Sequence, residues 1–327
     1  MQYIDMHCDT LMLQYFTGLQ EPDMAVSPAL HIDFSRMARV GQMAQFFAAF
    51  LPSLHSYEKR NKPIVSDEYY LKRCYEILQY NVKKYSHKIA MAYSGEDIEK
   101  NFAAGKMSAV FTMEDGRSVN GKLENLKRYY EEYGVRCLAL TWNFYNCFGA
   151  PNSPDPVIMY DGLTAFGREA VAYMQELGML VDVSHLSEGG FWDVAAICKK
   201  PFVATHSNCR ALCPHQRNLT DDQLRALAKA GGITGLNLAP EFLSADVKSK
   251  DSRVEDMCRM VQHVIDVAGE DTIAIGTDFD GIGGNLEING CGQMDLLDAG
   301  LAKAGIPCAV REKMYFKNVL RVLKAAL

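Results

Sequence analysis

The sequence opens on the segment MQYIDMHCDT, in which an imidazole and a carboxylate stand two residues apart at the end of an apolar run. Residues i and i+2 of an extended strand point to the same side, so His7 and Asp9 would converge. The intervening Cys8 would point to the opposite side and is interpreted as a packing residue. This pair is therefore the first candidate for metal binding or acid–base chemistry.

Four more polar residues end similar apolar runs: Glu114 in AVFTMED, His185 in LVDVSH, His206 in FVATHS and Asp278 in TIAIGTDFD. Each alone has an ordinary explanation, such as a hydrogen-bonded core histidine or a turn-forming aspartate. Three carboxylates gathered without a cation would repel one another, whereas histidine and carboxylate are usual zinc ligands. The set therefore favours a metal centre. Because one tetrahedral zinc would leave some of these ligands unused, it favours two zinc ions with a bridging hydroxide as the nucleophile.

The elements that would position these residues are short apolar runs that alternate with helical segments. We predict strands within residues 3–9, 44–51, 109–115, 135–142, 180–185, 202–207, 233–239 and 272–280. Runs apolar on both faces are typical of parallel strands buried under crossover helices. Eight such units favour a (β/α)8 TIM-type barrel over an open doubly wound sheet, and the carboxyl ends of barrel strands surround one active site. We predict the α/β class and a single metal-dependent hydrolase domain over residues 1–327.

Local signals place some of the helices. An apolar helical face ends at Gly178, and Thr220 to Gln223 and Ser252 to Glu255 have the spacing of a capping box. The segment 52–108, between the second and third runs, is too long for a simple crossover and contains a predicted helix from Asp67 to Tyr85. We interpret this segment as an insertion that could form a lid.

Composition excludes several classes of protein. The formal net charge of -6 and the lack of a basic tract argue against nucleic-acid binding. No apolar run approaches the roughly 20 residues of a membrane span, and the first residues do not have the pattern of a secretory signal. We therefore expect no membrane association and a cytoplasmic protein, in which the ten scattered cysteines are free thiols.

Six ordered motifs carry a family resemblance: DMHCDT, FTMEDG, VDVSHLS, ATHSNCRAL, HQRNLTDDQL and GTDFDG, between residue 4 and about residue 284. Together they resemble the renal (membrane) dipeptidase family, a branch of the metal-dependent amidohydrolases, in its microbial form. The resemblance implies a (β/α)8 barrel with two Zn²⁺ per chain that hydrolyses dipeptides, including those with a C-terminal D-residue. It also implies a small-molecule peptide substrate and a possible homodimer.

The resemblance also implies roles for the metal ligands. His7 and Asp9 would bind one zinc, His185 and His206 the other, and Glu114 would bridge the two ions.

Further roles concern the reaction and the substrate. Asp278 would pass a proton from the bridging water to the leaving amine, and Arg217 would bind the free carboxylate of the substrate with its guanidinium. The sequence departs from the animal enzymes at Trp142, where they have a histidine that helps to polarise the scissile carbonyl. An indole donates one hydrogen bond but carries no charge, so the zinc, Asn143 or a neighbour would have to polarise the carbonyl.

Two other functions remain open from the sequence. The first is another amidohydrolase that acts on N-acyl amino acids, lactones or cyclic amides. The second is a non-catalytic, metal-dependent peptide-binding protein, against which the complete ligand set and Asp278 argue.

Overall fold

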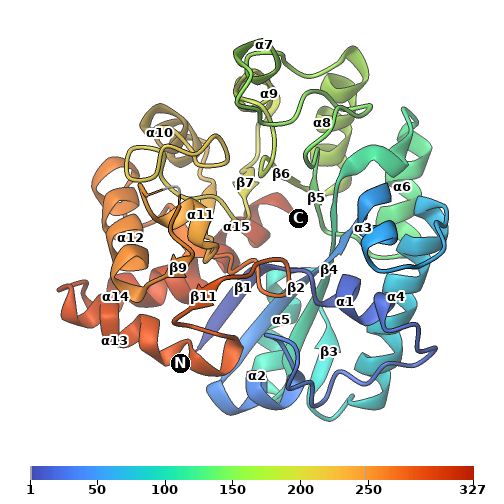
Figure 1. The fold of residues 1–327 in the computed structure, drawn as a ribbon, viewed down its shortest axis with the longest axis horizontal. Coiled ribbons are helices and arrows are strands. Elements are labelled where there is room, and N and C mark those ends of the chain that lie inside the picture. The colour runs from blue at the N-terminus through green and yellow to red at the C-terminus, as the bar shows by residue number, and fades with distance from the viewer. Residues whose placement is uncertain (1, 247) are drawn as a thin grey trace.

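The computed structural model describes residues 2–246 and 248–327 and contains a closed parallel barrel (Figure 1). Its eight strands are β1 (Tyr3–Cys8), β2 (Gln42–Phe50), β4 (Met107–Glu114), β5 (Cys137–Ala139), β6 (Leu180–Asp182), β7 (Val203–Ala204), β8 (Ile233–Leu236) and β10 (Ile273–Ile275). They follow the order β2-β1-β10-β8-β7-β6-β5-β4, and β2 pairs with β4 to close the ring. The predicted (β/α)8 barrel is confirmed, and each of the eight predicted runs overlaps one barrel strand, although β2 and β4 begin two residues before their predicted runs.

One strand of the main sheet lies outside this ring and was not predicted. Strand β3 (Ile89–Met91) pairs with the first residues of β4, which pair with β2 as well. A second, two-stranded sheet joins β9 (Asp251–Ser252) to β11 (Asn285–Leu286).

The helices surround the barrel and fill its connections (Figure 1). They are α1 (Thr10–Phe16), α2 (Phe34–Val40), α3 (Leu54–Lys59), α4 (Asp67–Lys84), α5 (Gly95–Ala103), α6 (Leu123–Glu132), α7 (Pro156–Met159), α8 (Ala165–Leu177), α9 (Glu188–Ile197), α10 (Asp221–Lys229), α11 (Pro240–Leu243), α12 (Val254–Ala268), α13 (Asp295–Lys303), α14 (Cys308–Glu312) and α15 (Asn318–Ala326). Shorter helical turns are η1 (Gly116–Val119), η2 (Cys291–Gln293) and η3 (Lys313–Lys317).

Two of the predicted helix ends are confirmed. Gly178 ends α8 in the left-handed region, at a φ of 76°, where a side chain would be strained. Thr220 and Gln223 form the predicted capping box at the start of α10.

The capping box predicted at Ser252 is wrong. Helix α12 begins at Val254, and the side chain of Glu287 accepts the hydrogen bond from the Val254 N–H at 2.8 Å. The Ser252 hydroxyl instead donates to the carbonyl oxygen of Leu238 at 2.6 Å. A carboxylate distant in sequence has therefore taken the place of the local cap.

The predicted insertion between the second and third barrel strands consists of α3, α4, β3 and α5, and α4 matches the predicted helix closely. Arg117, in the turn after β4, fastens this segment to the carboxyl end of the barrel. Its guanidinium pairs with Asp67 at 2.8 Å and donates to the carbonyl oxygens of Leu51 and Pro52 at 3.0 and 2.9 Å. The start of the insertion is thereby fixed beside the strand ends.

The opposite end of the barrel is covered by α15. Leu320 and Leu323 of this helix belong to one buried cluster with Ile4, Phe46 and other strand residues. An apolar floor therefore closes one end of the barrel and leaves the carboxyl ends of the strands free for polar groups.

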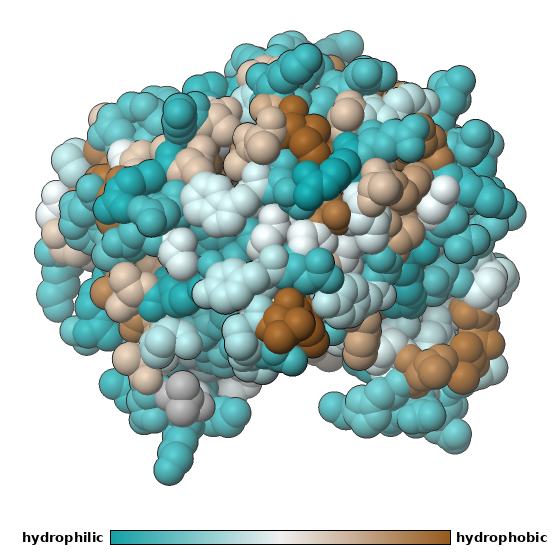
Figure 2. Space-filling model, turned by 90° about the horizontal axis from the view of Figure 1, so that it is seen from above, coloured by the Kyte–Doolittle hydropathy of each residue, from teal (hydrophilic) through white to brown (hydrophobic). Residues whose placement is uncertain are grey.

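The molecular surface contains both hydrophilic and apolar residues. Figure 2 shows one face, on which apolar residues form small separate groups among hydrophilic ones. Within the described ranges, the length and apolar character needed to cross a bilayer do not occur together in any helix.

We expect Leu323→Ala to lower the free energy of unfolding by about 2–5 kcal/mol, because it removes a core side chain that is only 2% exposed and leaves a cavity. Lys324→Ala on the same helix, which breaks a surface ion pair with Glu99, should change it by at most about 1 kcal/mol. Chemical denaturation of both variants measures the difference. Equal effects would contradict the assignment of α15 as the floor of the core.

Candidate metal centre

Three imidazoles meet at one carboxylate at the carboxyl end of the barrel. His7 lies in β1 and Glu114 ends β4, whereas His185 and His206 follow β6 and β7. The Oε2 atom of Glu114 lies 3.2 Å from His7 Nε2, and its Oε1 atom lies 2.8 Å from His185 Nε2 and 3.6 Å from His206 Nε2. One carboxylate thus faces His7 with one oxygen and the other two histidines with the second.

Two aspartates extend this cluster on the side of His7. The Nε2 atom of His7 lies 3.9 Å from Asp9 Oδ1 and 3.9 Å from Asp278 Oδ1. Candidate ligand atoms of His7, Glu114 and His206 lie within 4.8 Å of one another, as do those of His7, Asp9 and Asp278. The structure therefore brings the predicted ligands and Asp278 together, with His7 in both groups.

The polar atoms of this cluster fit a bound cation. His7 Nε2, Asp9 Oδ1 and His206 Nε2 are buried and have no hydrogen-bond partner among residues 2–246 and 248–327. Each such atom costs about 1–3 kcal/mol when it is left unpaired in a protein interior. Three of them aimed at one place match the donor set of a site for zinc or a similar divalent metal.

Hydrogen bonds behind the histidines orient their rings. The Nδ1 atom of His206 lies 2.8 Å from the hydroxyl oxygen of Thr205, which donates its own proton to the buried Asp182. The Thr205 oxygen therefore accepts from His206 Nδ1–H, and the lone pair of Nε2 faces Glu114. The side-chain oxygen of Asn143 accepts from His185 Nδ1 at 3.0 Å with the same effect.

The backbone is strained at two of these residues. His185 and Asp278 have φ angles of 68° and 61°, in the left-handed region that non-glycine residues seldom adopt. Asp278 is held by the side-chain amide of Asn237, which donates to its Oδ2 at 2.9 Å, and by its own N–H, which donates to the His7 carbonyl oxygen at 3.2 Å. Such conformations persist where the surroundings fix them, and they concentrate at functional sites.

Burial and neighbouring charges shift the pKa values of the metal-free cluster. Burial alone would lower the pKa of His7, but the neighbouring carboxylates of Glu114, Asp9 and Asp278 together outweigh burial and raise it to about 10. Burial would raise the pKa of Glu114, yet the charge on His7 and the close contacts that His7 and His185 make with this carboxylate together hold it well below its usual range. Burial raises the pKa of Asp9 well above its ordinary value and raises that of Asp278 to about 6.

The pKa values of the other two histidines are lowered instead of raised. Burial, with the positive charge of Arg217 adding to it, lowers the pKa of His185 to about 4. Burial also holds the pKa of His206 well below its usual value. Both imidazoles are therefore neutral near pH 7, which is the form that binds a metal.

The cluster opens into a pocket with two lobes. A larger lobe of about 590 Å³ contains Arg217, and a smaller lobe of about 270 Å³ is lined by the carboxylates of the cluster. Both lobes share Asn143, His185, Glu241 and Phe242. The two lobes are therefore adjacent at the strand ends, with these four residues as a common wall.

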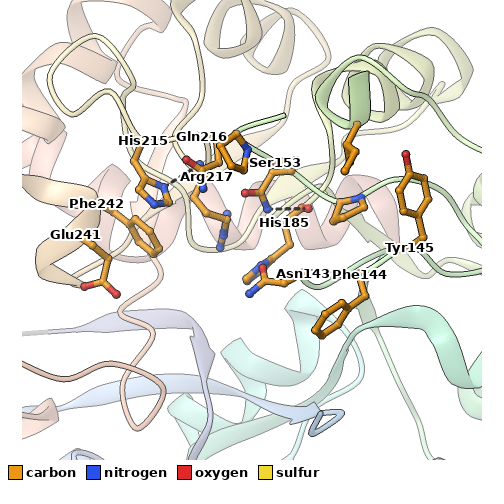
Figure 3. A pocket seen from close by; sticks show the side chains of 14 residues that line it. Asn143, Phe144, Tyr145, Ser153, His185, His215, Gln216, Arg217, Glu241 and Phe242 are labelled. Atoms are coloured by element: carbon orange, nitrogen blue, oxygen red, sulfur yellow. Dashed lines mark hydrogen bonds between the residues drawn. The ribbon is translucent and has the colours of Figure 1, made fainter. Parts of the chain in front are cut away.

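Arg217 is buried in the wall of the larger lobe, at 6% exposure, on the loop between β7 and α10. Figure 3 shows its guanidinium between His215 and Phe242 on one side and His185 on the other. It donates to the Ser207 hydroxyl at 3.2 Å and to the His206 carbonyl oxygen at 3.4 Å, while its Nε has no partner. Within the described residues it forms no ion pair, so its positive charge is available to a bound anion.

Trp142 forms part of an aromatic wall of the smaller lobe. Its ring centroid lies 4.9 Å from that of Phe50, 5.6 Å from that of Phe144 and 6.2 Å from that of His185. Asn143, the next residue, contacts His185 as described above. Both residues predicted to contact the substrate therefore line the pocket.

Cys8 was predicted to point away from the site. The structure confirms this, because Cys8 is fully buried and its thiol lies 3.4 Å from the Phe46 carbonyl oxygen. The ten cysteines are free thiols, as predicted.

Sequence reasoning missed the residues behind the histidines. A polar residue in the middle of a buried apolar run, such as Asp182 in LVDVSH, was the available signal for this second layer. It also missed Gly281, where a Cβ atom would lie 2.1 Å from Asp9 Oδ2 and 2.6 Å from Asp278 Oδ1. Glycine is required there because the carboxylates occupy the space of a side chain.

A model of the membrane dipeptidase family, peptidase family M19, matches residues 1–327. The chain belongs to the membrane dipeptidase family. An uncharacterised protein from Klebsiella pneumoniae is 36% identical over 255 residues, which cover 76% of this chain and 93% of that protein. The dipeptidase verJ from Clonostachys rogersoniana is 30% identical over 306 residues, which cover 90% of this chain and 75% of the relative.

Solved structures agree with membership of the membrane dipeptidase family. A metallo peptidase from Rhodobacter sphaeroides, liganded with a phosphinate mimic of the dipeptide L-Ala-D-Ala, is 27% identical with a TM-score of 0.87, and the match covers 100% of this chain and 99% of that one. The metallo peptidase dipeptidase AC is 28% identical with a TM-score of 0.88 and coverage of 100% and 98%. The predicted resemblance is confirmed, and the family is one of metal-dependent hydrolases.

We expect Gly281→Ala to weaken metal binding by about 10–100-fold, because the added methyl group would displace the carboxylates of Asp9 and Asp278. Gly283→Ala is the matched control, since nothing lies within 4 Å of its added Cβ. Titration against a chromophoric chelator measures both affinities. Wild-type affinity in Gly281→Ala would show that these carboxylates do not shape the site.

We also expect metal binding near pH 8 to release at least about one proton per chain. His7 is protonated below its metal-free pKa of about 10, and a ligand imidazole must be neutral. The apparent affinity should therefore rise with pH up to about 10. Calorimetry in two buffers with different ionisation enthalpies measures the proton release, and equal heats in both would contradict the expectation.

Proposed function

We propose that this member of the membrane dipeptidase family is a zinc-dependent dipeptidase with two zinc ions per chain. The observation that carries the proposal is the set of buried, unpartnered ligand atoms grouped around the two oxygens of Glu114. A single tetrahedral zinc would leave part of this donor set unused. The domain organisation, the cytoplasmic location and the possible homodimer stay predictions.

The proposed ligand roles follow the two sides of Glu114. His7 and Asp9 would hold one ion, His185 and His206 would hold the other, and Glu114 would be a ligand of both. Two bound zinc ions supply an activated water molecule and stabilise the negative charge that develops on the carbonyl oxygen.

Arg217 orients the substrate in this proposal. Its buried guanidinium binds the free carboxylate of the dipeptide in the larger lobe, and the scissile bond then lies over the cluster at the junction of the lobes. Asn143 and Trp142 line the path of the substrate beside His185. A C-terminal D-residue fits the proposal, because the relative from Rhodobacter sphaeroides binds a mimic of L-Ala-D-Ala.

Asp278 moves the proton. It lies beside His7, and Asn237 leaves its Oδ1 free to face the cluster. It accepts a proton from the attacking water and delivers it to the amine of the departing residue. The hydrogen bonds from Asn237 and to the His7 carbonyl oxygen keep this carboxylate in place against the strain of its backbone.

The decisive test is product release by the purified, zinc-reconstituted protein from pairs of dipeptides that differ only in a C-terminal L- or D-residue. We expect cleavage that a chelator abolishes, with the L-D pairs among the substrates. Asp278→Asn should retain the metal and lose about 10²–10⁴-fold in kcat, because a proton-transfer group is removed.

The outcomes separate the alternatives. An active Asp278→Asn enzyme would refute the role of this residue. Two bound metal ions without cleavage of any dipeptide would shift the function to N-acyl amino acids, lactones or cyclic amides, the other substrates of the scaffold.

A further inference from the structure

The smaller lobe of the pocket is lined by a positively charged side chain, Arg60, that has no role in the proposed reaction. The wall of this lobe combines polar and apolar side chains, and the insertion contributes Ser56 of α3 and Arg60, the residue at which this helix ends. The apolar part of the wall includes Met12, Phe50, Trp142 and Ile282. Arg60 therefore stands in the binding pocket, on the far side of the cluster from Arg217.

Two contacts hold the Arg60 side chain in this position. Its guanidinium lies over the ring of Phe16, 4.7 Å from the ring centroid, and its Nη1 donates to the Ser56 carbonyl oxygen at 3.2 Å. Arg60 forms no ion pair with any carboxylate of residues 2–246 and 248–327. A fixed guanidinium with unused donors is suited to a planar anion such as a carboxylate.

The other charges of this lobe do not neutralise Arg60. Asp9, Glu114 and Asp278 belong to the cluster at the floor, and Glu241 is exposed where the two lobes meet. The part of the substrate that extends past these carboxylates towards Arg60 would meet a positive charge within a partly apolar wall.

The orientation of the bound dipeptide determines which of its two residues lies near Arg60. If Arg217 binds the free carboxylate in the larger lobe, the N-terminal residue lies in the smaller lobe, a step that rests on the proposed function. We infer that the enzyme prefers dipeptides whose N-terminal residue is aspartyl or glutamyl, and that Arg60 binds the side-chain carboxylate. Arg60 is then a specificity-determining residue and takes no part in bond cleavage.

The test compares kcat/KM for matched substrates on the metal-reconstituted full chain. Asp-D-Ala is paired with Asn-D-Ala, and Glu-D-Ala with Gln-D-Ala, so that only the charge of the side chain changes. We expect a preference of about 10-fold or more for at least one acidic member. The preference should shrink towards 1 M salt, because Arg60 is partly exposed and its charge is screened.

Variants assign the preference to Arg60. In Arg60→Gln the acidic-to-amide ratio should fall to about one, and Arg60→Lys should keep part of it, because the charge remains but the planar fork is lost. Arg225→Gln is the matched control, since Arg225 pairs with Asp222 at 2.8 Å on the exposed side of α10 and should leave the ratio unchanged.

The outcomes distinguish this inference from the function on which it rests. Dipeptide cleavage by the wild-type protein without an acidic preference, or an unchanged ratio in Arg60→Gln, would overturn the role of Arg60 and leave the dipeptidase proposal intact. If no dipeptide is cleaved, the proposed function falls, and this inference falls with it.

Discussion

One buried carboxylate has to face three imidazoles, and this requirement organises the structure. Glu114 lies 2.8–3.6 Å from the Nε2 atoms of His7, His185 and His206, each of which comes from a different part of the ring of strands. These four groups come from four separate strand ends, so no single hairpin or helix could bring them together. Closure of the barrel through β2 and β4 brings these ends together. The favourable folding energy lies in the apolar layers around and below the site, whereas the cluster itself is left with unpaired polar atoms.

Two similar polar clamps inside the barrel hold the strands that carry the ligands. Asp5 accepts from the N–H and the hydroxyl of Thr277 on the neighbouring strand segment, at 2.9 and 2.7 Å. Asp182 accepts from the N–H of Thr205 at 2.9 Å and from its hydroxyl. Burial raises the pKa of both aspartates, and the threonine hydrogen bonds oppose that rise. The Asp5 clamp fixes the position of the segment that precedes Asp278, and the Asp182 clamp fixes the position of the segment that contains His206. These residues behind the site thereby determine the geometry of the candidate ligands.

The strands and the ligand set could be predicted because both follow from short-range patterns. A parallel strand buried on both faces reads as an apolar run, and a polar residue that ends several such runs must lie at one end of the barrel. The positions that could not be predicted depend on partners far apart in sequence. Glu287 displaces Ser252 as the cap of α12, and Gly281 is required by two carboxylates that no local pattern connects to it. Arg60 lies outside every motif, and its inferred role rests on its place in the pocket.

The tryptophan that departs from the animal enzymes can be understood from the same geometry. Trp142 packs against Phe50 and Phe144, so its ring serves as wall. The side-chain oxygen of Asn143 is engaged by His185 Nδ1, which leaves the amide nitrogen as the free donor of a residue that lines both lobes. In the proposed function the Trp-Asn pair would therefore divide two tasks between neighbours: an apolar contact for the substrate, and an amide that both orients His185 and offers a hydrogen bond where the lobes meet. In the proposed reaction, a neutral donor at that point would leave most of the charge stabilisation to the metal centre.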